Sequence, residues 1–180
     1  MKKGENYSSY NSKKDIPLVL ESYNDLFSDF DPRPYSQRAL SKDFIEECQK
    51  ASEDKKNGIE LKLLINKKER NNKEEDLIKK RINSHFSKHF LEKKKELLKM
   101  RFVGSIWFLV GCFLIVLTTF LDLQNQFFLV KVLIAIAHPG GWFFLWEGLG
   151  KIIIHSKEKK GDQVFYKKMN RAKISFLSIK

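Results

Sequence analysis

The stretch FVGSIWFLVGCFLIVLTTFL, residues 102–121, contains no charged residue over 20 positions. A helix rises about 1.5 Å per residue, so a stretch of this length matches a hydrocarbon core about 30 Å thick. A buried helix of a soluble protein is the alternative, but a chain of 180 residues has little volume in which to bury one. The stretch therefore predicts a transmembrane helix over 102–121.

A second apolar stretch begins after a short link at 122–126 and extends from Phe127 to Ile154. A link this short joins antiparallel neighbours. We therefore expect an α-helical membrane hairpin over 101–154, in which the second transmembrane helix covers 127–146.

Basic residues cluster on both sides of the predicted hairpin. Residues 79–101 hold nine basic and two acidic side chains, residues 151–180 hold the same numbers, and the link carries only Asp122. The positive-inside rule then predicts a multi-pass protein of the cell membrane with both termini in the cytoplasm. Much of the net charge of +12 would lie beside the anionic lipid of the inner leaflet. No recognised nucleic-acid motif accompanies this charge, so we expect no nucleic-acid partner.

The remaining residues predict a small cytosolic α+β domain, built from segments on both sides of the hairpin. Residues 1–15 are polar, lack the apolar core of a signal peptide and are expected to be disordered. Residues 16–40 predict a short helix opened by Pro17, followed by an extended connector that contains DPRPY. In that helix Val19, Tyr23, Phe27 and Phe30 would share one face.

Residues 41–100 predict a helix, a strand and a second helix. Ser41 is the expected N-cap of the first helix, and IELKLLIN at 59–66 alternates like a half-buried strand. Asn72 begins the second helix, which we expect to bend at 83–87, where several weak helix formers follow one another. Residues 155–180 predict a helix and a C-terminal strand that pairs with 59–66. Because a sheet of two strands is marginal alone, its edges are candidates for pairing with a second subunit or a partner peptide.

His85 and His89 stand four residues apart on a predicted helix, a spacing that can bind one metal ion. Zinc normally has three or four protein ligands, and no third ligand occupies an obvious position. We therefore interpret the pair as two histidines on a polar face and expect no metal, cofactor or catalytic site. A metal-dependent membrane enzyme that uses these histidines stays open as an alternative.

The motif HPGGWFFLWEGLGK at 138–151 places polar residues inside the second apolar stretch. Pro139 predicts a kink near 138–141, and the adjacent glycines allow close packing against the first span. Farther along, the tryptophans suit a membrane interface, and the acidic and basic residues have the i,i+4 spacing of an ion pair. The candidate residues for hairpin packing or the membrane interface are His138, Pro139, Gly140, Gly141, Trp142, Trp146, Glu147 and Lys151.

The segments DPRPYSQRALS at 31–41, IELKLLI at 59–65, PGGWFFLWEGL at 139–149 and KISF at 173–176 together resemble an uncharacterised family of small prokaryotic two-span membrane proteins. The resemblance covers roughly residues 23–179. It implies the hairpin architecture and a microbial source, and it brings no assigned activity.

These features predict a non-enzymatic interaction or assembly protein anchored by the hairpin. Its basic domain would lie at the inner leaflet, bind anionic lipid and recruit another protein or form a homo-oligomer. The alternative is a small pore-forming or membrane-perturbing effector, in which Lys131, His138 and Glu147 line an oligomeric path.

Overall fold

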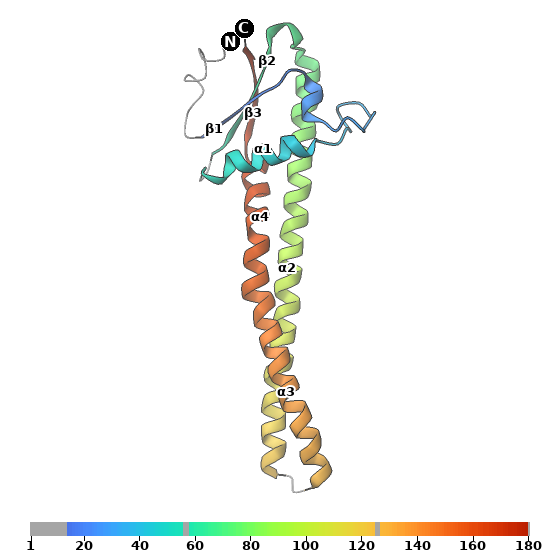
Figure 1. The fold of residues 1–180 in the computed structure, drawn as a ribbon, viewed down its shortest axis with the longest axis vertical. Helices are drawn as coiled ribbons and strands as arrows, with labels where there is room; N and C mark the ends of the chain where they lie inside the picture. Colours follow the sequence, from blue (N-terminus) through green and yellow to red (C-terminus); the bar gives the residue numbers. More distant parts are fainter. Residues whose placement is uncertain (1–13, 56–57, 125–126, 180) are drawn as a thin grey trace. The chain divides into compact units, whose positions relative to one another are not determined.

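A computed structural model describes residues 14–55, 58–124 and 127–179. The chain forms two compact units, one made of Met1–Leu91 with Gln163–Lys180 and the other of Glu92–Asp162. We call them the sheet unit and the hairpin unit, after the elements that each contains (Figure 1). The disorder expected for 1–15 falls almost entirely outside the described residues.

The sheet unit is built on three parallel strands in the order β1–β2–β3. They are β1 (Asp15–Val19), β2 (Glu60–Asn66) and β3 (Lys173–Ile179). Leu61 of β2 lies opposite Ile174 of β3, and Leu63 lies opposite Phe176. The predicted pairing of 59–66 with the C-terminal strand is therefore present.

Strand β1 was not predicted, and the helix expected at the start of 16–40 is wrong. Residues 15–19 pair with β2, and only a short 3-10 helix, η2 (Tyr23–Leu26), follows. Strand pairing explains the difference, because Ile16 and Leu18 then face the core while Pro17 occupies an edge strand that needs no outward donor. Two residues of the expected helical face, Val19 and Phe30, are 49% and 96% exposed.

The helices of the sheet unit begin where the sequence predicts. In α1 (Lys42–Glu53) the Oγ atom of Ser41 accepts a hydrogen bond from the main-chain nitrogen of Phe44 at 3.1 Å. A short η3 (Lys67–Glu69) precedes α2 (Asn72–Gln124), which continues through 83–87 without a break in the helix. Ile82 and Phe86 are fully buried there, so burial outweighs the weak helix propensity of their neighbours.

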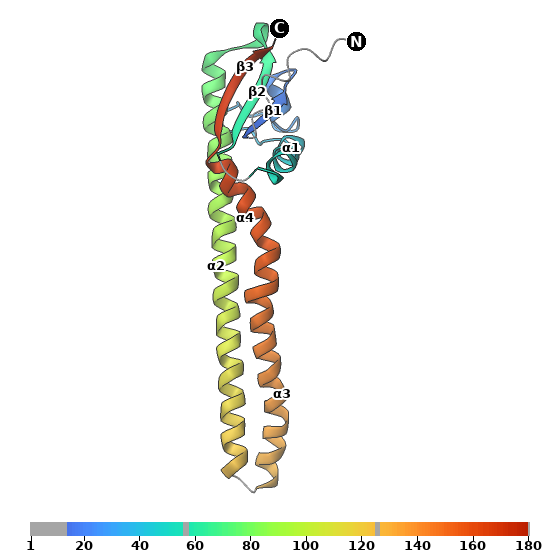
Figure 2. The ribbon, with the colours of Figure 1, turned by 90° about the vertical axis from the view of Figure 1, so that its left-hand side faces the viewer.

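A single apolar core fills the sheet unit between the sheet and the helices beside it (Figure 2). It draws on every strand, on α1, on the start of α2 and on the end of α4. Its fully buried members include Ile16, Leu26, Cys48, Leu61, Leu63, Ile65, Ile78, Ile82, Phe86 and Met169. Segments from both sides of the hairpin are therefore needed to complete this core.

The hairpin unit contains the later part of α2 and an almost continuous second helix. That second helix consists of α3 (Phe128–Gly150), a π-helical turn η4 (Lys151–His155) and α4 (Ser156–Asn170). By length and composition, the helices Asn72–Gln124 and Phe128–Asn170 could each cross a membrane. Both are longer than the predicted spans, and the short helix expected near the C-terminus is the end of α4. Pro139 lies inside α3, and the kink it predicts stays a prediction.

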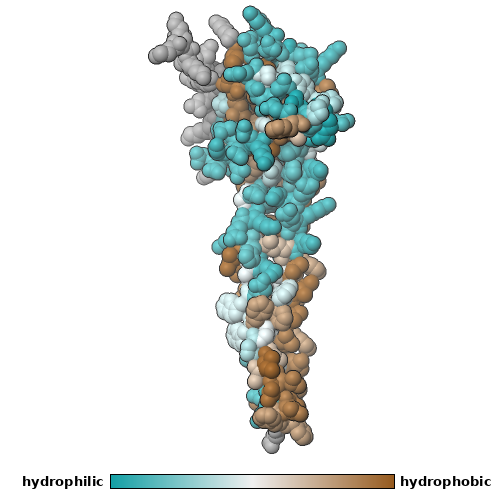
Figure 3. Space-filling model, turned by 45° about the vertical axis from the view of Figure 1, so that its right-hand side comes forward, coloured by the Kyte–Doolittle hydropathy of each residue, from teal (hydrophilic) through white to brown (hydrophobic). Residues whose placement is uncertain are grey.

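The hairpin presents an apolar surface, which is brown over the face drawn in Figure 3. Eight large apolar side chains on α2 and α3 are between 56% and 69% exposed: Phe102, Leu109, Phe113, Val116, Phe120, Leu133, Ile136 and Phe143. Soluble proteins seldom expose so much contiguous apolar surface.

Candidate functional site

A seam of small residues joins α2 and α3 within the hairpin unit. A methyl group on Gly111 would overlap the main-chain nitrogen of Leu145, so the two backbones approach more closely there than any side chain allows. A seven-residue repeat keeps such contacts on the facing sides of two helices. The buried positions of this glycine seam recur at that spacing: Gly104, Gly111 and Thr118 on α2, and Ile134, Gly141 and Gly148 on α3.

The two adjacent glycines of the HPGG motif have different surroundings. A Cβ atom on Gly141 would lie 2.9 Å from Cγ1 of Ile115, whereas a Cβ atom on Gly140 would meet nothing within 4 Å. The close packing predicted for both is present only at Gly141. Sequence reasoning missed Gly104 and Gly111, although their seven-residue spacing could have marked them.

His138, for which the sequence offers no partner, contacts Thr118 across the seam. The Oγ1 atom of Thr118 lies 3.0 Å from Nδ1 of His138, and it also lies 2.8 Å from the carbonyl oxygen of Leu114. A hydroxyl group has one proton. When that proton goes to the carbonyl oxygen, Nδ1 of His138 carries a proton and donates it to Thr118. The contact thus joins the two apolar segments through polar side chains.

The charged end of the motif packs onto α2 as well. The ion pair of Glu147 with Lys151, which their spacing predicts, is present. The Nζ atom of Lys151 also lies 5.1 Å from the ring centroid of Trp107, within range of a cation–π contact. Trp142 and Trp146 point outward instead, at 46% and 64% exposure, and their place at a membrane interface stays a prediction.

The π-helical turn η4 shifts the buried face of the second helix by one residue. Gly148 is buried, and the next buried position is Ser156, eight residues later rather than seven. A π-helical turn accommodates one extra residue, which accounts for that shift. The Oγ atom of Ser156 donates to the carbonyl oxygen of Lys151 at 3.1 Å, so the turn is also bonded within itself.

Exposed cations surround the hairpin beyond its apolar segments. Lys93 with Asp162, at 3.3 Å, and Lys159 with Glu96, at 3.6 Å, connect α2 with α4. These pairs are partly exposed, so each adds little stability. The other basic side chains of this region are exposed and form what we call the basic collar: Lys94, Lys95, Lys99, Arg101, Lys157 and Lys160.

The predicted histidine pair lies in the sheet unit, where the ring centroids of His85 and His89 are 4.3 Å apart. The Nε2 atom of His85 is buried, without a hydrogen-bond partner among the described residues. Burial lowers the pKa of His85 to about 4, and nearby His89 and Arg81 contribute to the shift. In the described part of the chain, no group of three or more His, Cys, Asp or Glu side chains could hold a metal ion. The pair therefore offers zinc two ligands, fewer than it normally takes.

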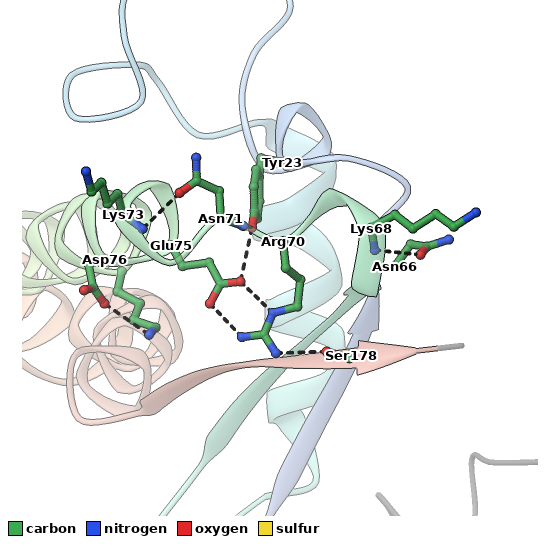
Figure 4. Close-up of polar contacts among 10 residues, drawn as sticks. Tyr23, Asn66, Lys68, Arg70, Asn71, Lys73, Glu75, Asp76 and Ser178 are labelled. Carbon is green, nitrogen blue, oxygen red and sulfur yellow. Dashed lines mark hydrogen bonds and ion pairs between the residues drawn. The ribbon is translucent and has the colours of Figure 1, made fainter.

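A buried polar network joins three segments of the sheet unit (Figure 4). The Glu75 carboxylate, 3% exposed, accepts two hydrogen bonds from Arg70 at 2.8 and 2.9 Å and a third from the Tyr23 hydroxyl at 3.1 Å. Arg70 also donates to Oγ of Ser178 at 3.0 Å, and Asn71 donates its main-chain N–H to Tyr23 at 2.8 Å. The guanidinium group holds the pKa of Glu75 below its ordinary value, while burial raises that of Tyr23. These groups satisfy one another, as a structural network requires.

The free thiol of the sheet unit has little reactivity to offer. Cys48 is completely buried, and burial raises its pKa to about 12. The thiolate is the reactive form of cysteine, so a thiol with this pKa is a poor nucleophile at neutral pH. Comparison with protein-family models, curated proteins and solved structures finds no match. The function is therefore inferred from the residues alone.

Proposed function

We propose that this protein is a non-enzymatic, membrane-anchored interaction or assembly protein. The hairpin anchors it, the basic collar binds anionic headgroups, and the sheet unit binds another protein or a second copy. The observation that carries the proposal is the exposed apolar surface of the hairpin beside the basic collar.

The apolar surface favours a lipid environment. Leaving a large apolar side chain in water rather than burying it costs about 1.5 to 3 kcal/mol, and eight such side chains are more than half exposed on the hairpin. The polar residues of the same segments face inward, as the contact of Thr118 with His138 illustrates. Inward polar groups and outward apolar groups are the arrangement expected of helices in lipid.

The charge distribution supports both termini being cytoplasmic. Each flank of the hairpin holds nine basic and two acidic residues, and the described part of the link holds only Asp122 as a charge. Exposed cations close to an anionic leaflet gain about 1 kcal/mol each, and the collar supplies six of them. A basic flank on each side of the hairpin favours placing both flanks on that side of the membrane.

Membrane extraction and cysteine labelling test the anchor and its orientation. We expect alkaline carbonate to leave the protein in the pellet and detergent to release it. In a Cys112→Ala background, an impermeant maleimide should label Leu123→Cys in intact cells and Lys160→Cys only after permeabilisation. Leu123 is 82% exposed at the end of α2, and Lys160 belongs to the basic collar. Release by carbonate, or the reverse labelling pattern, would refute the proposal.

Lipid retention tests the basic collar. Replacing Lys94, Lys95 and Lys99 with Gln should reduce the phosphatidylglycerol that copurifies with the protein and leave phosphatidylethanolamine unchanged. Replacing the exposed Lys42 and Lys50 of α1 with Gln is the matched control. Equal lipid retention in the two variants would contradict a headgroup role for the collar.

A pore-forming effector is the second candidate, and one observation favours it. Lys131 is exposed in α3 among apolar side chains, where a lone charge in lipid is costly. Against it, His138 and Glu147 already make contacts within the hairpin. Proteoliposomes separate the two: conductance that Lys131→Ala or Glu147→Ala abolishes would support the pore, and we expect none.

A further inference from the structure

The register of the sheet determines which main-chain groups of β3 point away from β2. The main-chain nitrogen of Lys173 donates to the carbonyl oxygen of Ile59 at 3.1 Å. In a parallel ladder, the N–H and C=O groups of successive residues point to opposite sides of the strand. Lys173 and every second residue after it therefore bond to β2. Ile174, Phe176 and Ser178 direct their main-chain groups to the outer edge.

The same reasoning applies to β1, the other outer strand. Glu60 donates to the carbonyl oxygen of Lys14 at 3.0 Å, which places the main-chain groups of Asp15, Pro17 and Val19 on the outer edge. Pro17 has no N–H, and the Nζ atom of Lys55 donates to the outward carbonyl oxygen of Asp15. Proline and lysine are the residues that natural proteins use to block an edge strand. The edge of β1 is blocked in this way.

The edge of β3 has no such block. Among the residues that the structure describes, no hydrogen bond reaches the main-chain groups of Ile174, Phe176 or Ser178 at this edge. Three donors and three acceptors thus stand at the spacing of a β ladder. A further strand can satisfy them all at once, as in β-augmentation.

The charge around β3 indicates the kind of strand that fits. Residues 163–180 hold five basic and no acidic side chains. The Nζ atom of Lys79 on α2 lies 5.7 Å from the ring centroid of Phe176, and Lys173 at the start of the strand is exposed. Carboxylates on an added strand would find cations nearby, whereas a basic strand would meet repulsion.

We propose that the outer edge of β3 binds an extended, acidic segment of a partner protein through the main-chain groups of Ile174, Phe176 and Ser178. The segment adds a fourth strand to the sheet and approaches the cations beside it. This binding mode rests on the proposed function, because it identifies the partner surface of an interaction protein.

Hydrogen exchange of the purified, detergent-solubilised protein tests this proposal with defined probes. One probe is an octapeptide of alternating valine and glutamate, and the control peptide alternates valine and lysine. The amides of Ile174, Phe176 and Ser178 should exchange quickly in the free protein. At about 90% occupancy by the acidic peptide they should exchange about tenfold more slowly, because exchange then proceeds through the free fraction.

Edge variants show whether the main chain of β3 is responsible. Ser178→Pro removes an outward N–H and should abolish the protection given by the acidic peptide. Ser178→Ala controls for the lost contact with Arg70, and Val19→Pro makes the same change on the blocked edge; both should keep the protection. Slow exchange of Ser175 and Leu177, whose amides bond to β2, reports that each variant is folded.

Each contrary result overturns a stated part of the proposal. Absence of protection by the acidic peptide, or protection that survives Ser178→Pro, refutes binding at this edge. Equal protection by the basic peptide refutes the acidic partner, and formation of a dimer that protects these amides without peptide identifies a second copy instead. The assay does not depend on membrane insertion, so its failure leaves the anchor standing. Likewise, failure of carbonate extraction leaves the edge proposal standing.

Discussion

Thr118 and His138, which lie 20 residues apart in sequence, face one another across the hairpin with Oγ1 and Nδ1 separated by 3.0 Å. The contact lies next to Pro139 and in line with the glycine seam. A polar pair at this position serves the packing of the two helices and has no free surface of its own. The seam and this pair thus account for the HPGG half of the motif, and the contacts of Glu147 and Lys151 account for its charged half.

Thr118→Val should weaken the hairpin, because valine keeps the shape of threonine and removes the hydroxyl that meets His138. Hydrogen bonds between helices in membranes contribute about 0.6 to 2 kcal/mol, and the loss should appear as a lower midpoint of thermal unfolding in detergent. Thr119→Val is the matched control, since the Oγ1 atom of Thr119 donates only to its own helix, at the carbonyl oxygen of Ile115. Equal destabilisation by both changes would mean that the contact across the seam contributes nothing.

Gly111→Leu should force α2 and α3 apart, because even a methyl group at this position would overlap the backbone of α3. Overpacking a tight contact costs about 1 to 3 kcal/mol and more when the backbone must move. Gly140→Leu provides the control, since a Cβ atom there meets nothing within 4 Å. Thermal stability in detergent should fall for the first variant and stay near that of the unmodified protein for the second. The reverse order would contradict the seam.

Local signals predicted much of the sheet unit. The helix starts at Ser41 and Asn72 carry capping residues, and the alternation at 59–66 identifies β2. Strand β1 escaped prediction because Tyr23 and Phe27 stand four apart, as on one face of a helix, and because Pro17 suggested a helix start. Pairing with β2 outweighs that local pattern, and it depends on residues more than 40 positions away.

The contacts of the hairpin depend on comparing two segments rather than on reading one. The repeat of Gly104 and Gly111 becomes informative only when it is set against the repeat of Gly141 and Gly148 on an antiparallel neighbour. His138 likewise had no visible partner, because the partner is fixed by the vertical match of the two helices. Spacing within one segment, in contrast, was sufficient to predict the ion pair of Glu147 with Lys151.

Glu75→Gln should destabilise the sheet unit by about 2 kcal/mol at pH 7, since hydrogen bonds to charged groups contribute about 1.5 to 3 kcal/mol. Arg70 holds the pKa of Glu75 below its ordinary value in the folded chain. A carboxylate of this kind contributes stability above its unfolded pKa, and the contribution is lost as pH falls through the folded pKa. Thermal unfolding followed by circular dichroism should therefore show that the variant loses less stability than the unmodified protein below about pH 4.3.

Glu47→Gln is the control for this change, because the ion pair of Glu47 with Lys50 is exposed and exposed pairs contribute little. The control should unfold like the unmodified protein at pH 7. If it loses as much stability as Glu75→Gln, burial of the network has no special energetic effect.

His85→Leu should flatten the dependence of stability on pH in the weakly acidic range. The pKa of His85 is lowered to about 4 in the folded chain, and an unfolded histidine titrates near about 6.5. Between these values the unfolded state binds the additional proton, so the free energy of unfolding of the unmodified protein decreases as pH falls from about 6.5 to about 4. His155→Leu is the control, because His155 is exposed in the hairpin unit. Urea unfolding at several pH values should give a smaller slope for His85→Leu alone; an unchanged slope would show that His85 does not titrate as a buried group.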